Sequence, residues 1–262
     1  MKCECVKNEI VEWLNKYLKQ SKQRGFVVGV SGGIDSALVS MLCAMTSFKT
    51  LLVQMPIHRK ENEIAERATK HIIMLTEKYK NVESYNHDLS SAYDSVCNTF
   101  PYSISELTGA NLRSRLRMVS LYTFSNQNQC LVVGTGNKVE DFGIGFFCKG
   151  GDGTVDISPI GDLLKSEVRE LAKWLGVSDE IVNAVPTDEL WEDGRSDETA
   201  IGATYDELEW AMNIIDHYTE KGLSDIKYRV LNERQREVLN IYETRHKANA
   251  HKMEMPPIYK LN

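Results

Sequence analysis

The stretch GFVVGVSGGIDSALVSMLC, residues 25–43, places a short polar segment between two apolar runs. Residues 26–30 have the composition of a buried strand, and residues 35–45 have the pattern of a helix. The peptide amides at a helix N-terminus lack hydrogen-bond partners and carry partial positive charge, and glycine lets an anion approach them closely. The turn between this strand and this helix is therefore predicted to bind phosphate.

The predicted phosphate-binding loop differs from the two commonest nucleotide-binding patterns. It has no lysine, as GxxxxGK[ST] requires, and it does not match GxGxxG. Asp35 would repel a bound phosphate unless a cation lay between them, and Mg²⁺ prefers carboxylate and phosphate oxygens, so Asp35 is a candidate metal ligand. The candidate nucleotide contacts are Gly29, Val30, Ser31, Gly32, Gly33, Ile34, Asp35 and Ser36.

The rest of the chain alternates strand and helix patterns. Further strands are predicted at residues 50–57, 82–86 and 130–136. Helices are predicted at residues 8–20, 61–79, 109–127, 165–176, 205–218 and 233–247. Buried strands that alternate with helices predict an α/β fold, with an open, mostly parallel sheet and helices on both faces.

Length and composition limit the classes of protein. The 262 residues, 42% of them hydrophobic, fit one domain over 1–262. The net charge of −6 argues against a nucleic-acid partner held by bulk electrostatics. There is no apolar run of membrane-spanning length, so we expect a cytoplasmic protein without a membrane partner. Six cysteines without a CxxC pair predict free thiols rather than zinc ligands or disulfides.

Two stretches of sequence resemble known enzymes. SGGIDS, residues 31–36, resembles the pyrophosphate loop of the N-type ATP pyrophosphatases, which cleave ATP between its α- and β-phosphates and adenylylate a substrate oxygen. Residues 132–172, VVGTGNKVEDFGIGFFCKGGDGTVDISPIGDLLKSEVRELA, resemble the central region of the NAD synthetase family. The likeness continues in GANLRSRLRMVSLY, PTDELWEDGRSDETAIGATYDELE and HKMEMPP.

The resemblance implies a Rossmann-like fold of the adenine-nucleotide alpha hydrolase type and a ligase reaction. In that reaction ATP, a co-substrate, activates the nicotinate carboxylate of deamido-NAD (nicotinic acid adenine dinucleotide) as an acyl adenylate. Ammonia then displaces AMP to give NAD, and pyrophosphate is the other product. The resemblance also implies Mg²⁺ and a homodimer.

Two residues outside the loop suit this chemistry on their own. Glu140 follows a predicted strand, as Asp35 does, and an open sheet places its ligands where strands end, so Glu140 can complete a magnesium site. Lys165 opens a predicted helix, where a lysine opposes the helix dipole, and this misfit points to a functional role. The resemblance implies the same metal ligand and pairs Lys165 with ATP phosphates. No catalytic residue is assigned, but Lys165, Asp35 and Ser31 are expected to support the transition state.

The remaining site residues come from the resemblance. It implies that Thr135 and Thr187 contact ATP. Arg115 shares a helical face with Asn111, opposite Arg113 and Arg117, and the resemblance makes it a deamido-NAD contact. The full set of implied deamido-NAD contacts is Arg115, Lys149, Asp156, His251 and Lys252.

Four details depart from the expected family pattern. Cys148 and Gly150 stand where threonine and tyrosine are common, and Gln54 stands where some relatives have arginine. The spacing from Glu140 to Lys149 is one residue longer than in some relatives. These departures concern the positioning of the dinucleotide rather than the class of reaction.

Two long loops are predicted, at 141–161 and 186–202. The second is strongly acidic, with Arg195 as its single basic residue. We expect it to close over the ligands with its acids outward, so that Thr187 and backbone amides face the nucleotide. The alternative is a disordered linker.

No glutaminase domain is expected in the chain, so ammonia would come from solution or from a separate glutaminase. Two rival functions remain at this point. One is another adenylating member of the superfamily that modifies tRNA, and the other is an ATP-sensing module without chemistry.

Overall fold

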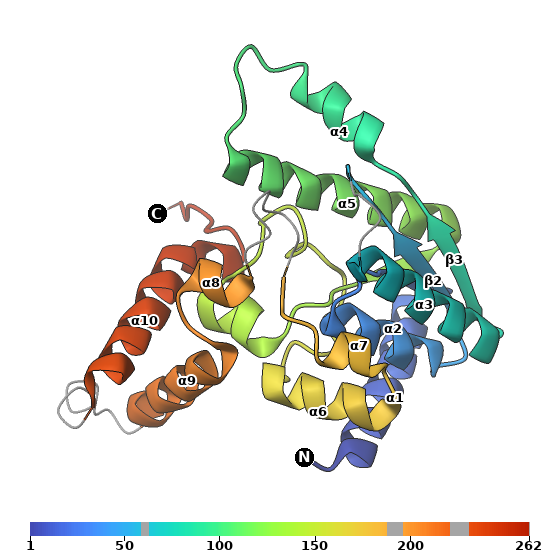
Figure 1. The fold of residues 1–262 in the computed structure, drawn as a ribbon. Coiled ribbons are helices and arrows are strands. Elements are labelled where there is room, and N and C mark those ends of the chain that lie inside the picture. Colours follow the sequence, from blue (N-terminus) through green and yellow to red (C-terminus); the bar gives the residue numbers. More distant parts are fainter. Residues whose placement is uncertain (59–62, 188–195, 221–230, 262) are drawn as a thin grey trace.

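The computed structural model describes residues 1–58, 63–187, 196–220 and 231–261 (Figure 1). Its centre is a four-stranded sheet in the order β3-β2-β1-β4, in which every neighbouring pair is parallel. The strands are β1 (Gly25–Gly29), β2 (Lys49–Gln54), β3 (Val82–Asn86) and β4 (Cys130–Val133). The predicted α/β fold with a parallel sheet is confirmed.

Helices cover both faces of the sheet because successive strand residues point to opposite sides. Phe26 and Val28 belong to the core on one face, and Val27 belongs to the core on the other. The first face carries α1 (Cys3–Ser21), α2 (Ile34–Ala44), α3 (Glu63–Lys78), α6 (Lys165–Leu175) and α7 (Asp179–Val182). The second face carries α4 (Ser90–Cys97) and α5 (Glu106–Asn128), which lie next to each other in Figure 1.

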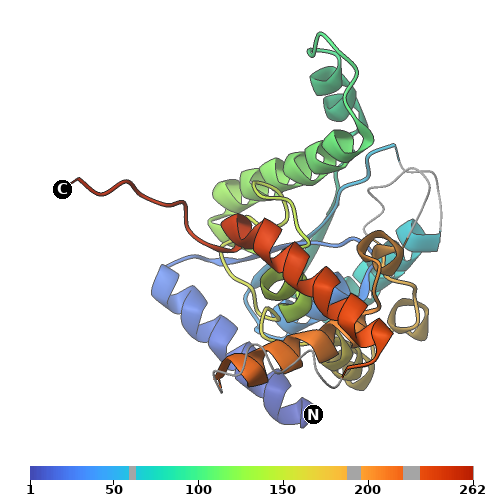
Figure 2. The ribbon, with the colours of Figure 1, turned by 90° about the vertical axis from the view of Figure 1, so that its left-hand side faces the viewer.

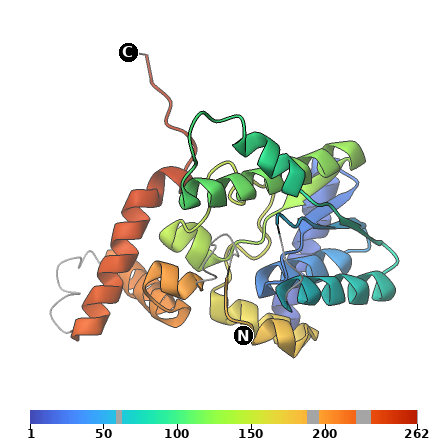
Figure 3. The ribbon, with the colours of Figure 1, turned by 45° about the horizontal axis from the view of Figure 1, so that its top comes forward.

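A third core lies beside the sheet and is formed mainly by helices (Figures 1 and 3). It combines the π-helix η1 (Val139–Ile144) with α8 (Asp197–Ile201), α9 (Tyr205–Glu220) and α10 (Glu233–Met253). Ser166 of α6 joins this unit to the sheet, because its backbone N–H and hydroxyl donate to the Glu209 carboxylate at 2.8 and 2.7 Å. After α10 the C-terminal segment extends away from the body (Figure 2).

The strand order determines where a ligand can bind. β1 pairs with β2 on one side and with β4 on the other, so the connections diverge between β1 and β4. In open parallel sheets, such a switch point leaves a crevice at the carboxyl ends of the two strands. The loops that follow Gly29 and Val133 both begin there.

Several boundaries differ from the sequence-based prediction. The first helix begins at Cys3 rather than at residue 8, because the Met1 ammonium is held by Glu170 and Cys3 packs into the core at 8% exposure. The strand predicted to end at 136 ends at Val133. The segment predicted as a loop over 141–161 begins inside η1, and that over 186–202 contains α8, while 188–195 lies outside the described residues.

All six cysteines are free, as predicted. In the part of the chain that the structure describes, no helix is both long enough and apolar enough to cross a bilayer.

Candidate active site

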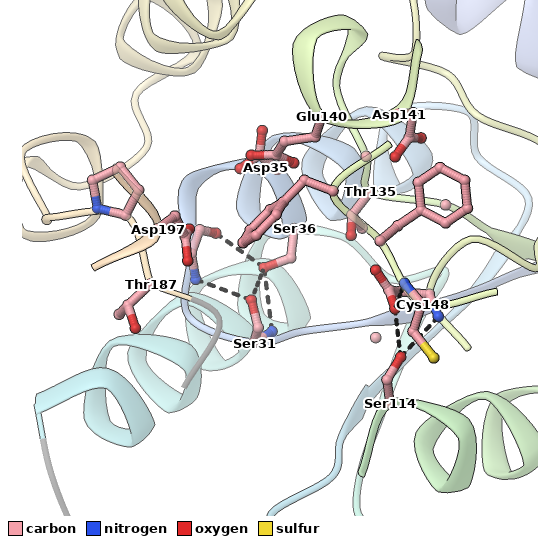
Figure 4. Close-up of a pocket in the computed structure, with 18 of the residues that line it drawn as sticks. Ser31, Asp35, Ser36, Ser114, Thr135, Glu140, Asp141, Cys148, Thr187 and Asp197 are labelled. Carbon is pink, nitrogen blue, oxygen red and sulfur yellow. Dashed lines mark hydrogen bonds between the residues drawn. The ribbon is translucent and has the colours of Figure 1, made fainter. Parts of the chain in front are cut away.

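Glycine and serine shape the loop between β1 and α2 (Figure 4). Gly32 has a φ of +93°, and a Cβ there would lie 2.5 Å from the Ile64 carbonyl oxygen. The Ser31 and Ser36 hydroxyls lie 3.1 Å apart, and the Ser36 hydroxyl donates to the Gly33 carbonyl at 3.0 Å. Among the described residues no side chain caps α2, so the amides at its N-terminus are available to an anion.

A buried ammonium joins the two predicted metal ligands. Lys165, the first residue of α6, is 3% exposed, and its Nζ lies 2.5 Å from Asp35 Oδ2 and 3.2 Å from Glu140 Oε1. Burial alone would lower the pKa of Lys165, but the two carboxylates outweigh it and raise the pKa above its ordinary value. Asn137 adds a hydrogen bond from Nδ2 to Asp35 Oδ1 at 3.2 Å. Asp35 and Glu140, which were predicted to share a cation, therefore lie at one site, and the Lys165 ammonium lies between them.

Tyr205, at the start of α9, completes this cluster. Its hydroxyl donates to Glu140 Oε1 at 2.5 Å, and its ring centroid lies 4.7 Å from Lys165 Nζ. The side chain is fully buried, and burial together with Glu140 raises the pKa of its hydroxyl. Tyr205 was not predicted from the sequence, because a single tyrosine at the start of an amphipathic helix has the pattern of an ordinary core residue.

A further carboxylate, Asp141, also faces the pocket (Figure 4). Its oxygens lie so close to Gly136 that a Cβ there would overlap them. Burial, followed by Glu140, Asp152 and Asp35, raises the pKa of Asp141 to about 8. Asp141 lies in η1, and a π-helix spans one more residue per hydrogen bond than an α-helix. The π-helix can therefore accommodate the extra residue between Glu140 and Lys149. That longer spacing was the only feature of the sequence that pointed to η1.

Four of the predicted dinucleotide contacts meet on a second wall of the pocket. Arg115 Nε and Nη2 donate to the Lys149 carbonyl at 3.4 and 3.3 Å, and Lys149 Nζ donates to the His251 carbonyl at 2.5 Å. Lys252 Nζ donates to the carbonyls of Gly145 and Phe147, each at 2.9 Å. Three segments distant in sequence thus form one basic wall: α5, the loop that follows η1, and the end of α10.

Asp156, the fifth predicted dinucleotide contact, has a different environment. Its carboxylate accepts hydrogen bonds from the Tyr122 hydroxyl at 3.1 Å and from the Val132 amide at 2.7 Å. It does not line the pocket in the described part of the chain. Asp152 is the carboxylate of this loop that does line it, and it accepts from the Ser114 hydroxyl at 2.5 Å.

The phosphate loop, the Lys165 cluster and the basic wall surround one cavity of about 880 Å³. This volume lies within the range of ligand pockets, which is roughly 300–1,000 Å³. Thr135 and Thr187 also line it, from different sides (Figure 4). Apart from Asp156, every residue predicted to contact a ligand lines this cavity.

The donor set fits Mg²⁺ held partly by a ligand. Within the described ranges, no group of three or more His, Cys, Asp or Glu residues has the arrangement of a metal site. Asp35 and Glu140 nevertheless both reach one cation, the Lys165 ammonium. Mg²⁺ commonly binds one or two carboxylates and completes its shell with phosphate oxygens and water, so this pair is sufficient for a shared site with ATP.

Comparison with known proteins identifies the family. The NAD synthase family model matches residues 6–256 of the chain. The chain belongs to the NAD synthase family. This result confirms the resemblance inferred from SGGIDS and from residues 132–172.

Individual members of the NAD synthase family align over nearly the whole chain. The NH(3)-dependent NAD(+) synthetase of Syntrophomonas wolfei is 34% identical and covers 98% of this chain and 96% of its own. The structure of NMN synthetase from Francisella tularensis has a TM-score of 0.84 at 29% identity and covers 100% of both chains. The NH3-dependent NAD synthetase of Campylobacter jejuni, in complex with nitrate, has a TM-score of 0.80 at 26% identity, covering 99% and 100%.

Proposed function

We propose that this protein is an ammonia-dependent NAD synthetase, which amidates deamido-NAD at the expense of ATP and releases AMP and pyrophosphate. The observation that carries the proposal is a single cavity with a phosphate-binding loop and a carboxylate pair at one wall and a basic surface at another. An enzyme that joins ATP to an anionic dinucleotide needs both surfaces close together. Relatives at 32–36% identity are named NH(3)-dependent NAD(+) synthetase.

The phosphate loop and its neighbours would orient ATP for attack at the α-phosphate. The amides at the start of α2 and the Ser31 and Ser36 hydroxyls donate to phosphate oxygens. Asp35 and Glu140 hold Mg²⁺, which when bound offsets the phosphate charge. Lys165 forms ion pairs with the same carboxylates, and its ammonium would stabilise the negative charge of the departing pyrophosphate. Thr135 and Thr187 line the cavity as further hydroxyl donors.

The basic wall would bind the deamido-NAD phosphates and bring the nicotinate carboxylate to the α-phosphate of ATP. Arg115, Lys149, His251 and Lys252 supply the donors, and each already belongs to a hydrogen-bonded network that fixes its position. Asp156 remains a predicted deamido-NAD contact, and the hydrogen bond that its carboxylate accepts from the Tyr122 hydroxyl would hold the Asp156 side chain in position.

The test is a product assay with purified protein, Mg-ATP, deamido-NAD and ammonium chloride. We expect NAD, AMP and pyrophosphate in equal amounts, and no NAD when glutamine replaces ammonium. Failure to form NAD from deamido-NAD, or release of ADP instead of AMP, would refute the proposal. NAD formation with glutamine alone would refute only the ammonia dependence.

A second candidate substrate is nicotinic acid mononucleotide. The Francisella tularensis structure, which matches this chain over its full length, is named NMN synthetase. The same adenylation and amidation of a nicotinate carboxylate would give NMN from the mononucleotide. The ratio of kcat/KM for the two nicotinate substrates distinguishes the candidates, and we expect deamido-NAD to be preferred at least about tenfold, as the loss of one good polar contact corresponds to roughly 1.4 kcal/mol.

Other predictions remain part of the proposal. They are a homodimer, a cytoplasmic location, ammonia supplied freely or by a separate glutaminase, and the absence of nucleic-acid and membrane partners. A gel shift with tRNA tests the rival tRNA-modifying function, and the product assay above tests the rival ATP-sensing function.

A further inference from the structure

Arg67 on α3 lines the cavity beside the phosphate loop. The first turn of α3 touches that loop, since the Ile64 carbonyl oxygen would lie 2.5 Å from a Cβ at Gly32. Arg67 follows Ile64 by three residues, so the two side chains share a helical face. A guanidinium is therefore within the same corner of the cavity as Ser31, Gly32 and Gly33.

The Arg67 guanidinium has an unsatisfied donor. Its Nε is buried and has no hydrogen-bond partner among the described residues. A buried donor without an acceptor costs about 1–3 kcal/mol, and more when the group is charged. Every other lysine or arginine that lines the cavity has an acceptor: a carboxylate for Lys165 and Arg169, and a backbone carbonyl for the rest.

The neighbouring Gln54 does not supply a charge at this corner. Its side chain is uncharged and already engaged, donating to the Ala65 carbonyl at 3.3 Å and accepting from the Thr69 hydroxyl at 3.3 Å. Lys165 keeps its charge but faces two carboxylates, so this cluster as a whole carries no excess of positive charge. A triphosphate in the loop would need another cation, and Arg67 lines the cavity here with an Nε that has no acceptor among the described residues.

We propose that Arg67 is a further substrate-binding residue of this site, which donates to the β- and γ-phosphates of ATP and to the pyrophosphate product. A phosphate oxygen in the loop gives the guanidinium the acceptor it lacks once the side chain turns toward Gly32. Arginine binds phosphate through a planar pair of donors, which lysine cannot reproduce. The inference rests on the proposed use of ATP by this cavity.

Three variants test it: Arg67→Gln, Arg67→Lys and the control Lys70→Gln. Lys70 lies on the same helix, is exposed, pairs with Glu66 and Glu180, and does not line the cavity, so its variant removes one charge without touching the site. Binding of pyrophosphate and of AMP is measured by titration calorimetry with Mg²⁺ present, and the KM values for ATP and deamido-NAD by product assay.

For Arg67→Gln we expect pyrophosphate binding to weaken, and the KM for ATP to rise, by about 10- to 100-fold, the usual contribution of a charge-assisted hydrogen bond. AMP binding and the KM for deamido-NAD should change less than about twofold, on the scale of a neutral surface substitution. Arg67→Lys should be intermediate, and Lys70→Gln should equal wild type.

Equal pyrophosphate affinity in wild type and Arg67→Gln would overturn the inference. If Arg67→Gln does not fold, as thermal unfolding would show, Arg67→Lys decides alone, and wild-type affinity for pyrophosphate in that variant counts against the proposal. The binding data do not depend on the second substrate. A wild-type protein that binds pyrophosphate but makes no NAD would refute the proposed function and leave the Arg67 comparison intact.

Discussion

At the scale of single residues, the charge balance around Lys165 explains why the site would need a further cation. One ammonium faces two carboxylates, Asp35 and Glu140, and burial together with nearby carboxylates raises the pKa of the adjacent Asp141 to about 8. A polyphosphate entering this corner meets excess negative charge. Either a divalent ion or a mobile side chain must offset that charge before ATP can bind.

Tyr205 is predicted to position Glu140 through its hydroxyl. Tyr205→Phe removes a hydrogen bond to a carboxylate that is 16% exposed and keeps the ring against Lys165. A hydrogen bond to a charged group contributes about 1.5–3 kcal/mol, so we expect kcat/KM to fall about tenfold or more. The concentration of Mg²⁺ at half-maximal rate should rise as well, since Glu140 is then less well oriented.

The matched control is Tyr242→Phe, which removes a hydroxyl from the same helical core. It should leave the magnesium dependence unchanged. Identical magnesium titrations for Tyr205→Phe and wild type would show that the hydroxyl has no positioning role, whatever happens to stability.

The residues that could be predicted from sequence are those whose local setting is itself unusual. Asp35 stands beside glycines at a strand–helix junction, and Lys165 opposes a helix dipole, so each attracts notice without the fold. Tyr205 and Arg67 could not be found that way. Their roles depend on contacts between α9 and η1 and between α3 and the phosphate loop, which only the tertiary structure defines.

At the scale of elements, the contact between α3 and the phosphate loop requires glycine at position 32. Gly32→Ala would place a side chain at φ +93° and 2.5 Å from the Ile64 carbonyl, so α3 would have to move. The left-handed backbone alone costs roughly 1–2 kcal/mol. We expect the free energy of unfolding, measured with urea, to fall by at least that amount.

Gly33→Ala is the comparison for Gly32→Ala. Gly33 has a φ of −86°, and the nearest atom to a Cβ there is the Ser31 hydroxyl at 3.4 Å. Its free energy of unfolding should stay within about 0.5 kcal/mol of wild type, as for ordinary surface changes. Equal stability of the two variants would mean that the loop adapts and that the close approach of α3 is not a constraint.

The packing of α2 on α3 is predicted to weaken in acid because of His71. Its Nε2 lies 3.0 Å from the Ser40 hydroxyl, and burial lowers the pKa of His71 to about 4. The unfolded state binds the proton near pH 6.5, so the neutral folded form is favoured above that pH and loses stability as the pH falls from 6.5 toward 4. The full shift corresponds to about 3 kcal/mol.

His71→Gln tests this, because glutamine can still hydrogen-bond to Ser40 and does not titrate. Between pH 7 and pH 4, the free energy of unfolding should fall about 3 kcal/mol further in wild type than in the variant. The control His87→Gln changes an exposed histidine and should follow wild type. Parallel pH curves for wild type and His71→Gln would contradict the assignment.

Element types were easier to predict than their boundaries. An apolar run such as residues 26–30 identifies a strand, because a sheet covered on both faces needs uninterrupted apolar residues. The start of α1 at Cys3 could not be predicted, since it depends on the ion pair between Met1 and Glu170. The π-helix η1 could not be predicted either, because a π-helix has no characteristic composition. Only the spacing between Glu140 and Lys149 pointed to it.

At the scale of the whole molecule, one cavity lies between the core around the sheet and the helical core, and residues from both line it. β1 and β4 bring the phosphate loop and Thr135 together, while η1, α8 and α10 contribute Glu140, Asp197 and the basic end at His251. Alternating strands and helices predicted the first part. Glu140 was also predicted from its place after a strand, and Asp197 was not predicted as a site residue. The role of His251 came from the resemblance alone, because no periodicity shows that the end of α10 returns to the loop that follows η1.

The homodimer is the prediction that belongs to this scale. The segment joining α4 to α5 projects from the body (Figure 1) and exposes Phe100 at 43% and Tyr102 at 67%, with Leu107 at 57% just inside α5. Leu107 also lines the cavity, so a partner covering this apolar group would adjoin the ligand site. Neighbouring exposed apolar side chains on an otherwise polar surface commonly mark interfaces.

We therefore expect light scattering after gel filtration to give twice the chain mass of 29.8 kDa. Tyr102→Glu should weaken the dimer at least about tenfold, because a buried unpaired carboxylate opposes association by more than 1.4 kcal/mol. Ile73→Glu on α3, where the apolar side chain is 49% exposed, should remain dimeric. A wild-type monomer would refute the dimer. A dimeric Tyr102→Glu protein would place the interface on another surface, and NAD formation by a stable monomer would show that the cavity is complete within one chain.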